Sequence, residues 1–383
     1  MRIGKTFPVL LILIISIIWF TGCEVKMTDN SGLDVNSLSD LGATIGTVWE
    51  NACATNLTTS TSGNWDSDEI ADPVVMKQGN LYHMWYSGKQ KYSDTIQIWR
   101  IGYAYSYDGI TWTKASSETN PVIDVSISTK PFDRDGARVS SVLYDSSAKM
   151  YKMWYRGYDK NPDDTISLYI MYAYSYYPNK EWYKYPASAS NKNASPVYVK
   201  QMTSDYSDSS NPELGSVSVF MEEYQYGSLT KKLFLMWYTK SSSGTYFPKI
   251  QSAYSNNETS FTDNLFTSFE GCTGDLFDTG YFMPTVIQDY YNGSQAYKMW
   301  FVSYATSGIA DRKVGFGISA TDGQVFTPQN SGNPVAEAGG LVQDAAGIGK
   351  PSVIREENKY KMWYAGVSLD GKYTICYKES VSH

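Results

Sequence analysis

Four charged side chains are unusual for their positions in an internal repeat of this sequence: Asp72, Arg138, Glu213 and Lys350. A fifth, Glu69, occupies in the first copy the position that Glu213 occupies in the third. Carboxylates accept hydrogen bonds and cationic side chains donate them, so opposite charges that meet at one place fit a site for a polar, hydroxyl-rich ligand. Whether these side chains meet depends on the elements that carry them.

The repeat is marked by a short phrase, Met-Trp followed by Tyr or Phe, that occurs five times along the chain. With the residue before it, the phrase spans His83–Tyr86, Lys152–Tyr155, Leu235–Tyr238, Lys298–Phe301 and Lys361–Tyr364. Such periodicity is typical of an array of similar structural units. A residue present in every copy is expected to build the unit, and a residue present in one copy is a candidate for function.

Each copy contains short runs that read as β-strands and are separated by turn residues. In the first copy these runs are 73–76, 81–86, 101–106 and 110–113, and Asp-Gly at 108–109 is a strong hairpin signal. Helical periodicity is absent from the sequence of the repeat. Four antiparallel strands per copy predict an all-β, five-bladed β-propeller whose Met-Trp-Tyr phrases pack between blades. His83, which replaces a lysine or leucine of other copies, is expected at the surface.

The fifth copy ends too early to contain a fourth strand, because only six residues follow 374–377. A bare strand edge would invite pairing with other chains. Residues 44–49 precede the first copy and end in a tryptophan that matches Trp112 in the fourth run of the first copy. We therefore expect this N-terminal segment to supply the missing strand and residues 44–380 to form a single propeller domain.

The first 22 residues read as a signal peptide. A basic start, Arg2 and Lys5, precedes an apolar run at 7–20 that is too short to span a bilayer. Phe-Thr-Gly-Cys at 20–23 resembles the lipobox of bacterial lipoproteins, in which Cys23 would carry the lipid; ordinary cleavage beside an accidental cysteine is the alternative. We expect residues 23–43 to be a flexible tether and the protein to be exported and lipid-anchored in the bacterial cell envelope, at the outer membrane or cell surface.

The composition of the chain excludes several classes of partner and cofactor. The net charge of −7 argues against nucleic acid, which binds basic surfaces. The sequence contains two histidines, and Cys53, Cys272 and Cys376 lack metal-ligand spacing, so we expect no metal and no cofactor. Outside the cytoplasm one pair of these cysteines could form a disulfide, and the sequence does not select the pair. We expect a monomer.

Aspartates recur six or seven residues before the first strand of four copies: Asp66, Asp133, Asp278 and Asp344. Because they belong to the repeat, we interpret them as structural residues that accept backbone N–H bonds in turns. Asp72, by contrast, stands immediately before the first strand of the first copy alone.

The first copy resembles the first blade of the five-bladed propeller glycosidases, the arabinanase, xylosidase, β-fructosidase and mannoside-phosphorylase group. The resemblance rests on Asp72-Pro73 together with 81–86 and 101–112. In that group an aspartate at the start of the first blade is the base or nucleophile, a second-blade aspartate tunes and orients, and a third-blade glutamate is the acid. The resemblance therefore implies Asp72, Asp135 and Glu213 in these roles.

Paired carboxylates of this kind would cleave a glycosidic bond. One protonates the leaving oxygen, and the other activates water or attacks the sugar. With Arg138, Lys350 and Glu69 as substrate-binding residues, the sequence favours a surface-anchored glycosidase that acts on an external oligo- or polysaccharide. A propeller that binds a glycan or a protein without catalysis is the alternative, and a purely structural envelope lipoprotein is the third reading.

Overall fold

The computed structural model describes ten stretches of the chain: 46–93, 96–125, 132–160, 166–185, 196–204, 216–241, 248–272, 275–278, 280–304 and 312–380. The expected signal peptide, the tether, Cys23 and Glu213 lie outside these residues. The regular secondary structure of the described stretches is almost wholly β-strand, so the all-β prediction is confirmed. Among them, no helix has the length and apolar character needed to cross a membrane.

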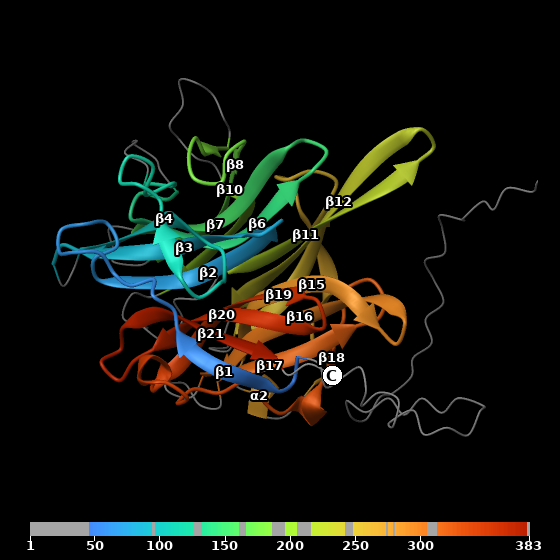
Figure 1. The fold of residues 1–383 in the computed structure, drawn as a ribbon. Helices are drawn as coiled ribbons and strands as arrows, with labels where there is room; N and C mark the ends of the chain where they lie inside the picture. Colours follow the sequence, from blue (N-terminus) through green and yellow to red (C-terminus); the bar gives the residue numbers. More distant parts are fainter. Residues whose placement is uncertain are drawn as a thin grey trace, which may run out of the picture.

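The strands form antiparallel units that follow one another along the chain (Figure 1). The first unit contains β2 (Glu69–Gln78), β3 (Leu81–Lys91), β4 (Gln97–Ser106) and β5 (Trp112–Lys114). The second contains β6 (Gly136–Asp145), β7 (Met150–Lys160), β8 (Ile166–Ser175) and β9 (Tyr183–Lys184), and β10 (Pro196–Ser204) also pairs with β8. A parallel bridge between Trp99 and Gly136 joins these two units into a nine-stranded sheet.

The remaining units are separate four-stranded sheets. The third contains β11 (Val217–Tyr226), β12 (Leu229–Ser241), β13 (Pro248–Ser255) and β14 (Thr262–Thr267), and the fourth contains β15 (Tyr281–Tyr291), β16 (Ser294–Tyr304), β17 (Arg312–Ser319) and β18 (Thr327–Pro328). The fifth contains β19 (Gly347–Glu356), β20 (Lys359–Val367), β21 (Tyr373–Ser380) and β1 (Trp49–Ala54). Short helical turns are α2 (Asp275–Asp278), η2 (Asn330–Gly332) and η3 (Val342–Asp344).

The two ends of the described chain lie side by side, because β1 pairs antiparallel with β21 (Figure 1). Trp49 faces Ser380 and Ala54 faces Cys376. The expected contribution of an N-terminal strand to the last unit is thus confirmed, but the strand begins at Trp49, where the sequence analysis has it end. The reason is a turn at Gly46, whose φ is +93° and whose carbonyl accepts the Nε1–H of Trp49.

The tryptophans of the repeated phrase tie each unit to the next. Each is buried and donates its Nε1–H to a carbonyl in the following unit: Trp85 to Pro178, Trp154 to Glu258, Trp237 to Gly323, Trp300 to Gly46 and Trp363 to Gly109. Gly109 is required at its position, because a Cβ there would lie 2.8 Å from the Trp363 ring. The prediction that these phrases pack between units is confirmed.

The recurring aspartates have a different role from the expected one. Three of the four bind the hydroxyl of a phrase tyrosine: Tyr86 donates to Asp66, Tyr155 to Asp133 and Tyr364 to Asp344. Of these three acids, Asp344 also accepts backbone N–H bonds, from Gly339 and Leu341. The interpretation as turn caps is therefore wrong for Asp66 and Asp133. The side chain of Asp278 lies outside what the structure describes.

His83 is buried, at 6% exposure, which corrects the expectation of a surface residue. Its Nδ1 lies 2.7 Å from the Tyr103 hydroxyl, and the rings of Trp85 and Tyr151 pack around it. Burial lowers the pKa of His83, so the ring is neutral at neutral pH. An uncharged aromatic ring can fill this interface between the first and second units, which explains why a histidine is compatible with the position.

Two of the cysteines are free thiols, Cys53 on β1 and Cys376 on β21. In the strand register Cys53 faces Tyr377 while Cys376 faces Ala54. Successive residues of a strand point to opposite faces, so these two thiols lie on opposite sides of the sheet and cannot bond to each other. Burial raises the pKa of Cys376 to about 12, which keeps it an unreactive thiol.

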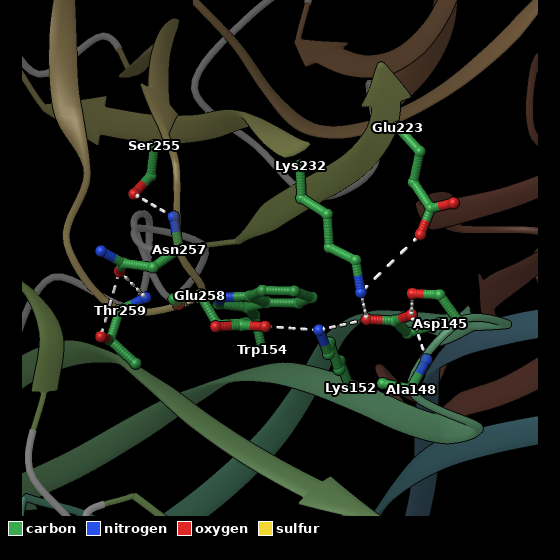
Figure 2. A network of polar contacts seen from close by, with 11 residues as sticks. Asp145, Ala148, Lys152, Trp154, Glu223, Lys232, Ser255, Asn257, Glu258 and Thr259 are labelled. Atoms are coloured by element: carbon green, nitrogen blue, oxygen red, sulfur yellow. Dashed lines mark hydrogen bonds and ion pairs between the residues drawn. The ribbon is translucent and has the colours of Figure 1, made fainter. Parts of the chain in front are cut away.

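A second set of contacts joins the units at the far ends of their first strands. Glu222, Asp289 and Glu356 each accept a hydrogen bond from the tyrosine that lies two residues before the Met-Trp of the next unit, and Gln78 does the same with Tyr151. Phe234 replaces this tyrosine in the third unit, and there Lys232 binds Asp145 instead (Figure 2). We call these contacts the inter-unit belt.

The belt should make stability depend on pH. Burial alone would raise the pKa of Glu356, but hydrogen bonds from Lys361, Lys77 and Tyr82 lower it to about 2. A carboxylate whose pKa is lower in the folded state stabilises the fold above its unfolded pKa of about 4.3, and this stabilisation is lost as the pH falls toward 2. We expect the urea midpoint of unfolding to fall across this interval, and to fall less in Glu356→Gln. An identical pH profile in the variant would contradict this role of Glu356.

Candidate functional site

Asp72 lies near the start of β2 in an irregular part of the strand. The register between β2 and β3 shifts between Ala71 and Val74, and Asp72 has a φ of +50°. Such a conformation is strained for a residue with a side chain and is common at functional sites. Met283, at the corresponding position of the fourth unit, has a φ of +53°, so the conformation belongs to the repeat and does not by itself mark a catalytic residue.

Two arginines of the second unit hold the Asp72 carboxylate. Arg138 on β6 donates from Nε to Oδ2 at 2.6 Å and from its second nitrogen to Oδ1 at 2.8 Å. Arg156 on β7 places a guanidinium nitrogen 3.6 Å from Oδ2. All three side chains are buried, with residue exposures of 1%, 4% and 0% for Asp72, Arg138 and Arg156. Two parallel bonds to a planar guanidinium are the strongest form of this pairing.

This environment decides the protonation state of Asp72. Burial alone would raise its pKa, but the positive charges of Arg138 and Arg156 lower the pKa to about 2. The carboxylate is therefore ionised at neutral pH and cannot serve as a general acid. The same arginines make it a weak base, because a carboxylate with a low pKa has little affinity for a proton.

Lys350 contacts the backbone of the second unit. From β19 its ammonium donates to the carbonyl of Ser140 and lies 3.4 Å from the carbonyl of Val139. The side chain is buried, and its charge contributes to the lowered pKa of Asp72. Lys350 thus lies close enough for its charge to act on Asp72, but its ammonium binds the main-chain oxygens of the two residues that follow Arg138 on β6.

Glu69 lies in the same cluster as Asp72. It forms an ion pair with Lys89, which also lies 3.0 Å from Asp68. Burial raises the pKa of Glu69, while the charge of Lys89 opposes the rise. The ring of Trp99 connects the two pairs, because the Arg138 guanidinium lies 4.3 Å and the Lys89 ammonium 5.5 Å from its centroid.

Asp135 is placed differently from the other expected site residues. It precedes β6, its side chain is 40% exposed, and it pairs with Arg134 at 3.0 Å. Arg134 also reaches Asp159 at 2.9 Å. The structure thus places Asp135 in a surface ion pair with Arg134, at a point where its backbone N–H donates to the Tyr158 carbonyl, rather than in the buried pair of Asp72 with Arg138. Glu213, the expected acid, lies outside the described residues.

Arg156 and Trp99 belong to the cluster but are missing from the sequence prediction. A comparison of second strands would have found Arg156, whose position holds Ser87, Thr239, Val302 and Ala365 in the other copies. A long cation where the repeat otherwise carries small or aliphatic residues is the signal that identifies this position.

A cavity of about 300 Å³ lies between the first strands of the units. The residues that line it include Ser141, Ser218, Ser352 and Lys350. Pro73 lines it, while Asp72 and Arg138 do not. In the described part of the chain, no group of three or more histidine, cysteine, aspartate or glutamate side chains is placed to hold a metal ion.

The sequence matches no protein-family model and no curated protein. Solved structures share its fold. A glycosyl hydrolase from Bacteroides ovatus has 14% identity and a TM-score of 0.59, and the match covers 89% of this chain and 91% of that one. The α-L-arabinofuranosidase from Podospora anserina, in complex with cellotriose, has 12% identity and a TM-score of 0.56, with 88% and 99% covered.

A third structure comes from the GH130 family of mannoside phosphorylases, which contains glycoside hydrolases that target β-1,2 mannosidic linkages in Candida mannan. It has 16% identity and a TM-score of 0.58, and the match covers 82% of this chain and 85% of that one. At these identities the likeness shows the fold alone. The resemblance of the first unit to propeller glycosidases is confirmed at that level.

Proposed function

We propose that this protein is a glycoside hydrolase-like propeller of five blades that recognises an extracellular glycan at the cluster around Asp72. The blade count is supported by the tryptophan bonds, which lead from each unit to the next and from the fifth back to the first. It is also supported by the first strands, since β2, β6, β11, β15 and β19 contact one another in order and β19 contacts β2.

Recognition, rather than catalysis, is the role that the geometry of Asp72 favours. The single observation behind this choice is the buried fork that Asp72 forms with Arg138, with both oxygens engaged. A catalytic nucleophile must reach the sugar, and a general base must bind a proton. Asp72 is only 1% exposed and has a pKa of about 2, so it is poorly suited to both roles. In this proposal Asp72 holds Arg138 rigid beside Trp99, and the half-buried ring and its charged neighbours contact the glycan.

Glycoside hydrolysis is the second candidate, and the Glu69–Asp72 pair favours it. The pKa of Glu69 is raised and that of Asp72 is lowered within one cluster, which is the division that acid and base roles require. An acid would protonate the glycosidic oxygen while a carboxylate attacks the sugar or activates water. Glu213 is the alternative acid under this reading.

We also propose that the protein is exported and held at the cell envelope by a lipid on Cys23. The support is the basic start, the apolar run and the Phe-Thr-Gly-Cys sequence at 20–23. A lipid anchor would place a glycan-binding domain outside the membrane without a spanning helix. Mass spectrometry of the N-terminal peptide would detect the lipid, and an unmodified Cys23 would contradict this assignment.

Binding and turnover can be separated in one experiment on the full-length protein. We expect calorimetry to show binding of one or more of β-1,2-mannobiose, xylobiose, arabinobiose and cellotriose without release of reducing sugar. Trp99→Ala should weaken that binding at least tenfold, since the ring bridges both ion pairs. Tyr107→Ala, which removes a 76% exposed ring of the same unit, is the matched control.

Two results would overturn the proposal. Absence of binding to all four sugars would exclude recognition of this class of glycan. Release of reducing sugar that is lost in Glu69→Gln, with an unchanged unfolding midpoint, would replace recognition with hydrolysis.

A further inference from the structure

Three of the five units fill the seam to the next unit with a lysine. Lys152 binds Asp145 at 2.5 Å and reaches Glu258 of the third unit, as Figure 2 shows. Lys298 binds Asp289 and the Tyr360 hydroxyl, and Lys361 binds Glu356 and the Tyr82 hydroxyl. In each case the lysine precedes Met-Trp and pairs with the acid of its own first strand.

The third unit lacks this lysine. Leu235 occupies the position, and its side chain is shorter and apolar. The acid of the belt is still present, since Glu222 accepts a bond from the Tyr297 hydroxyl and lies 3.3 Å from the Gln288 amide. With leucine at this position, the third unit lacks the lysine side-chain atoms that fill the interface to the next unit elsewhere, and it lacks their positive charge.

A cavity of about 390 Å³ lies at this seam, between the third and fourth units. We call it the Leu235 groove. It is lined by Glu222, Leu233, Leu235, Tyr254, Asn264, Tyr297, Thr321, Asp322 and Gln324. Its volume lies within the range of about 300–1,000 Å³ that is typical of small-molecule sites. The groove is remote in sequence from Asp72 and shares none of the residues around it.

The lining is amphipathic. Leu233 and Leu235 supply an apolar surface, and Tyr254, on the strand beside Leu235, supplies an aromatic ring that is 43% exposed. Glu222 and Asp322 bring carboxylates to the lining, and Asn264 and Gln324 bring amides. The Gln324 amide donates to Asp322 and the Asn264 amide to Ser252, so their amide oxygens remain as acceptors. The C–H face of a sugar ring packs on aromatic and aliphatic carbon, while its hydroxyls donate to carboxylates and exchange bonds with amides.

We propose that the Leu235 groove is a second glycan-binding site, specific for a neutral oligosaccharide. Its ionisable lining residues other than tyrosine are the two acids, so uronates and phosphates are repelled while hydroxyl donors are favoured. This site goes beyond the recognition proposed at Asp72, and it stands whether that cluster binds, cleaves or does neither. Two sites on one propeller would allow a polysaccharide to be held at both.

The test restores the lysine of the repeat. Leu235→Lys should fill the groove and pair with Glu222, as Lys152, Lys298 and Lys361 do with their acids, so the variant should fold with an unchanged or higher unfolding midpoint. Saturation-transfer difference NMR would be recorded on the full-length protein with β-1,2-mannobiose, xylobiose, cellotriose and digalacturonate. The Trp99→Ala variant should still give a signal with the neutral sugars, because its groove is intact. In the Trp99→Ala background, Leu235→Lys should abolish this signal and Tyr254→Ala should weaken it at least tenfold.

Tyr105→Ala is the matched control, because Tyr105 holds the position of Tyr254 in the first unit, beside His83 instead of leucine. Its signal should equal that of the wild-type protein. A neutral-sugar signal that Leu235→Lys leaves unchanged but Trp99→Ala removes would overturn the groove and leave recognition at the Asp72 cluster intact. Equal signals from digalacturonate and the neutral sugars would contradict the assigned ligand class.

Discussion

Replacing Arg138 with methionine is expected to destabilise the folded protein by about 3–5 kcal/mol, because the change leaves a buried charge without its main partner. Asp72 is 1% exposed and cannot regain water where it lies. Arg156 remains at 3.6 Å, too far for a hydrogen bond of ordinary length, so it compensates the charge only in part. Urea unfolding followed by tryptophan fluorescence would measure the loss as a lower midpoint.

A double substitution separates the charge from the packing. Asp72→Asn combined with Arg138→Met removes both members of the pair. Because Arg156 then loses its carboxylate, we expect the double variant to be destabilised too, but by less than the sum of the two single variants. Arg134→Met is the control, since Arg134 forms its ion pairs at the surface with its side chain 48% exposed, where such pairs contribute ~0–1 kcal/mol. Equal losses in Arg138→Met and Arg134→Met would contradict the picture of a buried fork.

Removing β1 is expected to abolish cooperative unfolding. A chain that begins at residue 55 leaves the edge of β21 unpaired and exposes the buried Trp300 ring, which packs edge-on to Trp49 at 6.3 Å and donates to the Gly46 carbonyl. A typical domain is stable by only about 5–15 kcal/mol, so the loss of a strand and its contacts from the fifth unit should exceed this free energy of unfolding. The bare edge should also cause aggregation.

The measurement is thermal unfolding by calorimetry together with size-exclusion chromatography. A chain that begins at residue 44 keeps β1 and the Gly46 turn, and we expect it to unfold at the same temperature as the full-length protein. Adding a peptide of residues 44–56 to the shorter chain should restore a cooperative transition. A sharp transition at the wild-type temperature without β1 would show that the last unit is complete with three strands.

Much of the fold could be predicted because the signals are local and recur. Alternation along 81–86, the Asp-Gly turn at 108–109 and the missing fourth run after 374–377 each depend on neighbouring residues. Repetition then tests every local reading against other copies, which is how the pairing of β1 with the last unit was predicted. The first residue of β1 was predicted wrongly. The turn at Gly46 depends on hydrogen bonds from Trp49 and from the distant Trp300, and not only on the residues next to Gly46 in the sequence.

The site was predicted only in part. Comparison of the copies identified Asp72, Arg138, Lys350 and Glu69, and the structure gathers these four into one cluster with Arg156 and Trp99. Asp135, chosen by resemblance alone, lies in a surface ion pair. A motif match to a family gives the sequence position of a residue, but it does not give the backbone conformation that decides where the side chain points.

The sequence by itself determined the all-β architecture, the order of the units and the residues that make each unit, because these follow from side-chain alternation, turn chemistry and repetition over short distances. Only the tertiary structure decided that Arg138 closes on Asp72, 66 residues away, and that a leucine in place of a lysine leaves a groove at one seam. Contacts between units depend on how far long side chains extend and on the twist of the facing sheets. The local pattern of residues determines neither quantity.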